Sequence, residues 1–192
     1  MELRCADPGL SAAPPSPLAV RLSSRGARGS IVAAGLVLGL LACGPTATFS
    51  GGVFRRGAVA YRVGPLSSDW QRLRSSGSDL AFRHTHGGTV VVHGQCPAQD
   101  DAPLDVLTNH LLFGVTARKE QARTTLSLDG REALRTQLFA SVDGVTVGLD
   151  LVVLKKDGCL YDLQLIAGPA HFAARQLDFT AFVAGFATQK DR

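Results

Sequence analysis

The stretch that decides the fold is residues 124–166, which read TTLSLDGREALRTQLFASVDGVTVGLDLVVLKKDGCLYDLQLI. Three Asp-Gly pairs divide it into four runs of alternating polar and apolar residues, and these runs are Thr124–Leu128, Glu132–Val142, Val145–Lys155 and Cys159–Ile166. Asp-Gly suits a two-residue turn that needs positive φ, and such turns join neighbouring antiparallel strands. The pairs Asp129-Gly130, Asp143-Gly144 and Asp157-Gly158 therefore predict an antiparallel meander of four strands.

Shorter strands are predicted before the meander. Residues 58–64 alternate through Val59, Tyr61 and Val63, residues 79–84 place Leu80 and Phe82 on one face, and residues 89–93 form a β-branched run after two glycines. Alternation between turn residues is typical of strands that are buried on one face.

A first helix is predicted over residues 103–113. Leu104, Leu107 and Leu111 recur at helical spacing, Pro103 suits the first turn, and Asp101 is placed to cap the start.

A second helix is predicted at the C-terminus. Phe179, Phe182, Val183 and Phe186 form one helical stripe, with Asp178 as its N-cap, and such a stripe is typical of packing against a sheet. The fold class is thus α+β, an antiparallel meander covered by two or three helices, in a single domain over residues 58–192.

The N-terminus resembles an export signal. Basic residues precede an uncharged apolar run over residues 31–41, and small residues follow it around Cys43. This order is that of a secretory signal, and the run is too short to cross a bilayer. A buried core helix is the alternative, but the basic flank and the Pro-rich stretch before it argue against that interpretation. The leader is long, which suggests a translation start near Val20.

Leu40-Leu41-Ala42-Cys43-Gly44 is similar to the bacterial lipobox, the motif whose cysteine is acylated before cleavage. The resemblance implies a signal peptide over residues 1–42 and a lipid anchor on Cys43, followed by a flexible tether over residues 43–57. Two or more acyl chains, palmitate among them, give stable anchoring. Gly44 after the cysteine favours the outer membrane, with the domain facing the periplasm. The chain also resembles uncharacterised lipoproteins of myxobacterial type.

The order of elements resembles that of the PsbP-like group of small lipoproteins and lumenal proteins. The residues that carry this resemblance are Trp70, Gly130-Arg131-Glu132-Ala133 and Phe182-Val183-Ala184-Gly185-Phe186. It implies a fold over residues 58–187 and no catalytic residue.

Two cysteines follow the proposed lipidation site, Cys96 and Cys159. An even pair in an oxidising compartment suggests a disulfide, and two free buried thiols are the alternative. No Cys-x-x-Cys is present, so a thiol redox catalyst is not expected.

His84 and His86, with His93 and Cys96 nearby, are the one cluster that suggests a metal site. The two first histidines also lie where a strand meets a Gly-Gly turn, an ordinary place for polar side chains, so no metal and no cofactor is expected.

Other motifs argue against catalysis and nucleic-acid binding. No Gly-x-Ser-x-Gly is present, and hence no nucleophile elbow. After residue 43 the chain carries 16 Lys or Arg against 14 Asp or Glu, with no basic run longer than two residues. A nucleic-acid surface would need a basic patch. Arg72, Arg74 and Arg83 could share a face, although a solvated surface is the preferred interpretation.

The predicted function is that of a membrane-anchored envelope lipoprotein with a non-catalytic binding or structural role, in contact with the membrane through its lipid and with an envelope protein as partner. The alternative is a small-ligand carrier whose apolar pocket, between sheet and helices, is lined by Phe139, Leu163 and Phe172. An enzyme would need a cleft of polar groups with shifted pKa values, which no motif indicates.

Overall fold

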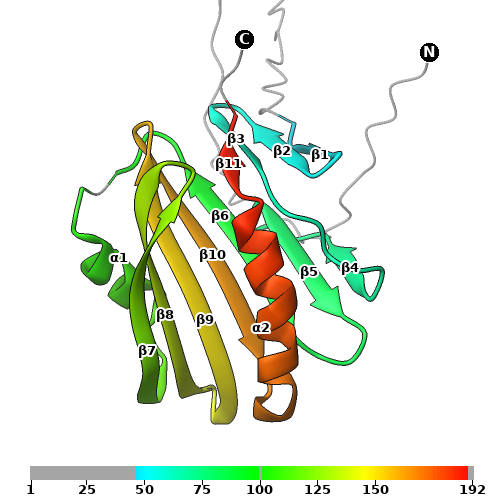
Figure 1. The fold of residues 1–192 in the computed structure, drawn as a ribbon, viewed down its shortest axis with the longest axis vertical. Helices are drawn as coiled ribbons and strands as arrows, with labels where there is room; N and C mark the ends of the chain where they lie inside the picture. The colour runs from blue at the N-terminus through cyan, green and yellow to red at the C-terminus, as the bar shows by residue number, and fades with distance from the viewer. Residues whose placement is uncertain (1–45, 100, 190–192) are drawn as a thin grey trace, which may run out of the picture. The chain divides into compact units, whose positions relative to one another are not determined.

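The predicted meander is present as four long strands, β7 (Thr116–Leu128), β8 (Arg131–Val142), β9 (Val145–Lys156) and β10 (Cys159–Ala167) (Figure 1). The structure is a computed structural model that describes residues 46–99 and 101–189, all within one compact unit. Each Asp-Gly pair forms a two-residue turn with positive φ at both positions, for example 50° at Asp129 and 72° at Gly130. Neighbouring strands are antiparallel.

Three shorter strands extend this sheet. They are β4 (Trp70–Leu73), β5 (Leu80–His84) and β6 (Thr89–Gln95), and the order of the seven-stranded sheet is β4-β5-β6-β10-β9-β8-β7. The last strand of the meander, β10, pairs with β6, so that the two halves of the chain meet at the centre of the sheet. Strand β4 was not predicted, because Trp70–Leu73 has only one buried residue.

A second, four-stranded sheet contains β1 (Thr48–Ser50), β2 (Val53–Arg56), β3 (Val59–Arg62) and β11 (Ala187–Thr188). The tether predicted over residues 43–57 is therefore wrong from Thr48 onward. Its glycines form hairpin turns, with φ of 57° at Gly51 and 75° at Gly52, and Phe54 is fully buried. The folded domain accordingly begins ten residues before the predicted Ala58.

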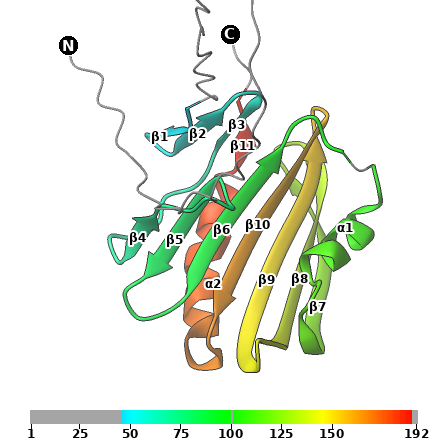
Figure 2. The same cartoon turned by 180° about the vertical axis from the view of Figure 1, so that it is seen from behind.

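The two helices lie on opposite faces of the large sheet (Figures 1 and 2). Helix α1 (Leu104–Leu111) packs on β8 and β9, and helix α2 (Pro169–Ala184) packs on β9 and β10. The predicted caps are wrong at both helices. Pro103 precedes α1 without a side-chain cap, while Asp101 pairs with Lys155.

Helix α2 begins nine residues before the predicted Asp178, because Pro169 sets the first turn after Gly168. Asp178 instead lies in the third turn. The predicted aromatic stripe is buried, with Phe179 and Phe182 fully covered, and Phe172 adds one more ring near the helix start.

The space between α2 and the sheet is filled. Phe139 and Phe172 are in edge contact at 5.4 Å, and Leu163 is fully buried in the same core. A Cβ on Gly148 would lie 2.4 Å from the Phe172 ring, so the absence of a side chain there makes room for this ring. The carrier cavity predicted at Phe139, Leu163 and Phe172 is therefore replaced by packed core.

The end of α2 also holds the two sheets together. The Gly64 amide donates to the Phe182 carbonyl at 2.9 Å, and a Cβ on Gly185 would lie 2.3 Å from the Gly64 Cα. Two glycines thus permit backbone contact between the end of β3 and the end of α2. The chain then continues into β11, which pairs with β3.

The predicted α+β class is confirmed: an antiparallel sheet carries one helix on each face. The predicted signal peptide over residues 1–42 and the predicted lipidation site Cys43 lie outside the described residues. Within the described part of the chain, neither helix has the length and apolar character that membrane crossing requires.

Gly148→Ala is expected to lower the free energy of unfolding by about 1–3 kcal/mol, because the added methyl group displaces Phe172 from a filled site. Urea unfolding followed by circular dichroism measures the change. Gly77→Ala is the matched control, since a Cβ there meets nothing within 4 Å, and it should stay within about 0.5 kcal/mol of wild type. Equal effects of the two substitutions would contradict the filled interface.

Candidate functional site

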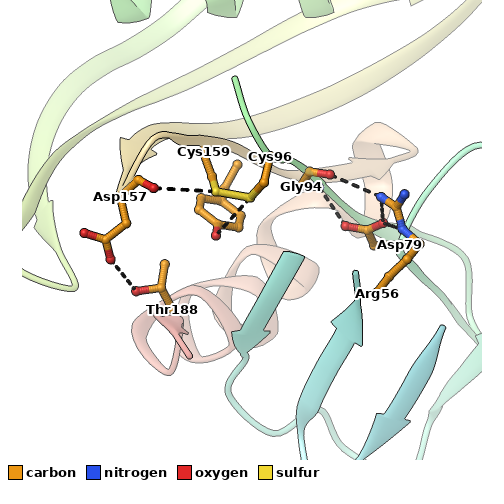
Figure 3. The surroundings of a disulfide bond; sticks show 8 residues. Arg56, Asp79, Gly94, Cys96, Asp157, Cys159 and Thr188 are labelled. Atoms are coloured by element: carbon orange, nitrogen blue, oxygen red, sulfur yellow. Dashed lines mark hydrogen bonds and ion pairs between the residues drawn. A yellow bond between two sulfur atoms is a disulfide. The ribbon is translucent and has the colours of Figure 1, made fainter. Parts of the chain in front are cut away.

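The structure joins Cys96 and Cys159, the two cysteines that the sequence analysis paired, in a disulfide with a Cα–Cα distance of 4.5 Å (Figure 3). Cys96 directly follows β6 and Cys159 opens β10, so the paired strands bring the two side chains together. The hydroxyl of Tyr161 lies 3.9 Å from the Cys96 sulfur. Burial raises the pKa of Tyr161 to about 12, so this hydroxyl stays neutral.

A buried ion pair lies beside the disulfide. The Arg56 guanidinium, at the end of β2, donates to Asp79 Oδ1 at 2.6 and 3.0 Å and to the Gly94 carbonyl at 3.3 Å (Figure 3). The other carboxylate oxygen accepts the Gly94 amide at 2.7 Å. The Asp79 side chain is only 2% exposed, against 40% for Arg56. The pair therefore anchors an arginine at the surface and joins the small sheet to the large one.

A cavity of about 560 Å³ opens on one side of this pair. Three arginines from two sheets line it, Arg56 from β2, Arg72 from β4 and Arg74 just after β4. The turn between β4 and β5 contributes Ser75, Ser76 and Ser78 to the lining. We call this site the arginine cavity.

Two of the arginines in this cavity keep free hydrogen-bonding capacity. The Arg72 guanidinium carbon lies 4.9 Å from the centre of the Phe49 ring, so the aromatic face of β1 supports it without using its N–H groups. Among the described residues, neither Arg72 nor Arg74 has an ion-pair partner, whereas Arg56 is bound to Asp79. The cavity can therefore accept an anion at Arg72 and Arg74.

A second cavity of about 300 Å³ lies on the other side of Arg56 and is bounded by Gln95 and Cys96. Arg56 and His93 line both cavities. Arg56 therefore belongs to the lining of both cavities, and Cys96 of the disulfide belongs to the lining of the smaller one.

The residues considered from the sequence as a possible metal cluster have other partners in the structure. Cys96 is in the disulfide, and His84 is buried, with its Nδ1 accepting the His86 amide at 2.9 Å and its Nε2 placed 2.7 Å from Arg175. Burial, and then the Arg175 cation, lower the pKa of His84. Within the part of the chain that the structure describes, no three His, Cys, Asp or Glu side chains are grouped as a metal site requires.

His84 belongs to a polar cluster that joins β4 and β5 to α2. The Trp70 indole donates to Asp178 Oδ2 at 3.1 Å, and Arg175 donates to the same oxygen at 3.1 Å. Trp70 and Asp178 were both noted in the sequence. Their hydrogen bond gives them a structural role, because it holds α2 on the sheet.

One buried carboxyl lacks a full set of partners. Asp162 on β10 is 6% exposed, and its Oδ1 has no hydrogen-bond partner among the described residues. Burial raises the pKa of Asp162 from 3.8 to about 7. It faces away from α2, opposite His93 in the register of β6 and β10, and outside both cavities.

Arg72, Arg74 and Arg83 were considered from the sequence as a possible basic face. The first two lie in the arginine cavity, whereas Arg83 is exposed elsewhere. Arg56 and Asp79 were not predicted, because they are 23 residues apart, with Arg56 in β2 of the small sheet and Asp79 directly before β5 of the large one. No local pattern in the sequence signals their pairing.

Removal of the disulfide is expected to lower the free energy of unfolding by about 4 kcal/mol, the loop-closure value for a separation of this size. The comparison is between oxidised wild type and Cys96→Ala/Cys159→Ala in urea. Reductant should shift the wild-type midpoint toward that of the variant and leave the variant unchanged. A wild-type midpoint that reductant does not move would refute the bridge.

Asp162→Asn is expected to change the pH dependence of stability. Because the folded-state pKa is raised, the folded protein binds more protons than the unfolded chain between about pH 4 and 7, so this carboxyl destabilises the fold as pH rises through that window. The stability gained by the variant should therefore grow over that window, by up to about 4 kcal/mol. Urea midpoints at several pH values measure it, with Asp105→Asn on the exposed face of α1 as control. A difference that is flat with pH would contradict the raised pKa.

Comparison with known proteins identifies the fold alone. No protein-family model and no curated protein matches the chain. Among solved structures, LpqN, involved in cell envelope biogenesis of Mycobacterium tuberculosis, is similar with a TM-score of 0.51 and 16% identity, over 76% of this chain and 90% of that one. Cyanobacterial PsbP from Synechocystis is similar over 84% and 98% of the two chains, with 13% identity and a TM-score of 0.49. Protein PA94 of unknown function from Pseudomonas aeruginosa follows with 16% identity over 73% and 96%, and a TM-score of 0.41. This chain therefore shares its fold with LpqN at low sequence identity.

Proposed function

We propose that this chain is a cell-envelope lipoprotein, anchored to a membrane through Cys43, whose domain binds an anionic ligand or partner without catalysing a reaction. The anchor rests on Leu40-Leu41-Ala42-Cys43, which follows an apolar run of export-signal length. The outer membrane and the periplasm are the location that Gly44 favours. LpqN is involved in cell envelope biogenesis, which agrees with an envelope location, but the likeness concerns the fold, so the leader is the basis of this proposal.

The proposal that the domain binds an anion rests on the arginine cavity. Guanidinium and hydroxyl groups are donors that hold carboxylate and phosphate oxygens, and Arg does so with two parallel hydrogen bonds. Catalytic sites usually combine a cleft with titratable groups of shifted pKa. Here the groups whose pKa is shifted, His84, Tyr161, Asp129 and Asp162 among them, lie outside the arginine cavity. Binding is therefore favoured over catalysis.

A small-ligand carrier is the second candidate, at a different place from the predicted one. A cavity of about 390 Å³ lies between the small sheet and the end of α2, lined by apolar side chains that include Phe49, Trp70 and Phe182. Quenching of Trp70 fluorescence by an apolar probe in this cavity would favour the carrier.

The anchor is tested by labelling cells with radioactive palmitate. The wild-type chain should incorporate label and fractionate with membranes, and Cys43→Ser should incorporate none, because the thiol is the acceptor. Cys96→Ser is the matched control, since its thiol belongs to the disulfide, and it should label like wild type. Label that persists in Cys43→Ser would overturn the anchor.

A further inference from the structure

The arginine cavity belongs to the basic part of a chain whose charge is unevenly distributed. Residues 46–99 hold six arginines against Asp69 and Asp79, a formal charge of +4, whereas residues 101–189 hold eight Lys or Arg against ten Asp or Glu, a charge of −2. The near-neutral total conceals this separation. Asp79 is already paired with Arg56. The charges of the other two arginines, Arg72 and Arg74, therefore leave the cavity with a net positive charge.

The cavity has the size and donors of a site for a phosphate-bearing group. Its volume of about 560 Å³ falls within the range of roughly 300–1,000 Å³ found for small-molecule sites, and it exceeds what a bare phosphate ion fills. Two guanidinium groups without an ion-pair partner and three serines belong to its lining, and their side chains are donors of the kind that hold phosphate oxygens. Leu73 and Phe54 supply apolar wall for the remainder of a larger molecule.

The position of the cavity along the chain identifies the source of that phosphate. Ala47 lines the cavity and lies only four residues after Cys43. Even a fully extended chain of four residues spans about 14 Å. Acyl chains on Cys43 would therefore keep the cavity within this distance of the membrane in which they are inserted, where headgroup phosphates are present at high local concentration.

We propose that the arginine cavity binds the phosphate of an anionic lipid headgroup in the membrane that holds the chain, with Arg72 and Arg74 as the phosphate ligands and Arg56 as the wall that Asp79 fixes. The choice of lipid over a free anion rests on the proposed anchor at Cys43. The ligand chemistry rests on the cavity alone.

The test uses the full chain purified in a non-ionic detergent and titrated by calorimetry with dihexanoyl phosphatidylglycerol below its micellar concentration. Binding should be at least tenfold tighter than for dihexanoyl phosphatidylcholine, whose headgroup is zwitterionic. Arg72→Gln/Arg74→Gln should weaken binding of the anionic lipid at least tenfold. Both side chains are exposed, and an unchanged thermal midpoint verifies that the variant is folded.

Arg62→Gln/Arg83→Gln is the matched control. It removes the same charge from the same part of the chain, but both arginines are exposed and lie outside the cavity. Its affinity should stay within twofold of wild type. An equal loss in this control would show attraction by overall charge and would overturn the cavity as the site.

Inorganic phosphate, titrated in parallel, distinguishes the two sources of the anion. Weak or no binding of phosphate beside tight binding of the anionic lipid supports the proposal, whereas equal affinities, or no binding of either, overturn it. Lipid binding in detergent does not require acylation, and palmitate labelling does not require Arg72. A failed anchor and a failed cavity therefore give different results.

Discussion

The side-chain alternation of the meander is the constraint on which the rest of this structure depends. A shift of one residue in the pairing of β9 would exchange its two faces. The three Asp-Gly turns prevent this, because each fixes the pairing at the point where two strands meet. In the observed register Leu149 and Leu151 face the side of α1, and Val152 and Leu154 belong to the core under α2. The same register starts β10 at Cys159, which is why this thiol reaches the end of β6.

Two of the turn aspartates, Asp129 and Asp157, also connect the meander to the small sheet through Thr188. Asp129 Oδ2 accepts the backbone amide and the hydroxyl of Thr188 on β11, both at 2.9 Å, and lies 3.3 Å from the Lys156 ammonium. Burial alone would raise the pKa of Asp129, but the hydrogen bonds from Thr188 and Lys156 outweigh it and leave this pKa below its usual value. Because β11 pairs with β3, these contacts fix the position of β2, and with it the position of Arg56.

The sequence predicts best what local chemistry decides. Turns with positive φ and strands of alternating residues are specified within a few positions, so the meander and the aromatic stripe of α2 were predicted. The β1–β2 hairpin was not predicted, because the segment around Gly51 and Gly52 has the composition of a flexible tether. The burial of Phe54, which the local sequence does not reveal, is what holds this segment in the fold. The arginine cavity was beyond prediction for a stronger reason. Its walls come from β2, β4 and the following turn, and only the meeting of two sheets brings them together.

The positive charge of residues 46–99 affects how an anchored domain would lie against a membrane. Near an anionic surface each arginine contributes about 1 kcal/mol of attraction, which falls off within a Debye length. On a chain anchored at Cys43, the small sheet and β4 follow the anchor directly, so the basic region is the part that the short connection holds closest to the lipid. The slight acidic excess of residues 101–189 comes from Asp101 and Asp105, because the meander strands with their turns, and likewise α2, carry equal numbers of acidic and basic residues. Attraction of the arginines near the proposed anchor would therefore favour an orientation in which the residues around the arginine cavity lie next to the headgroups.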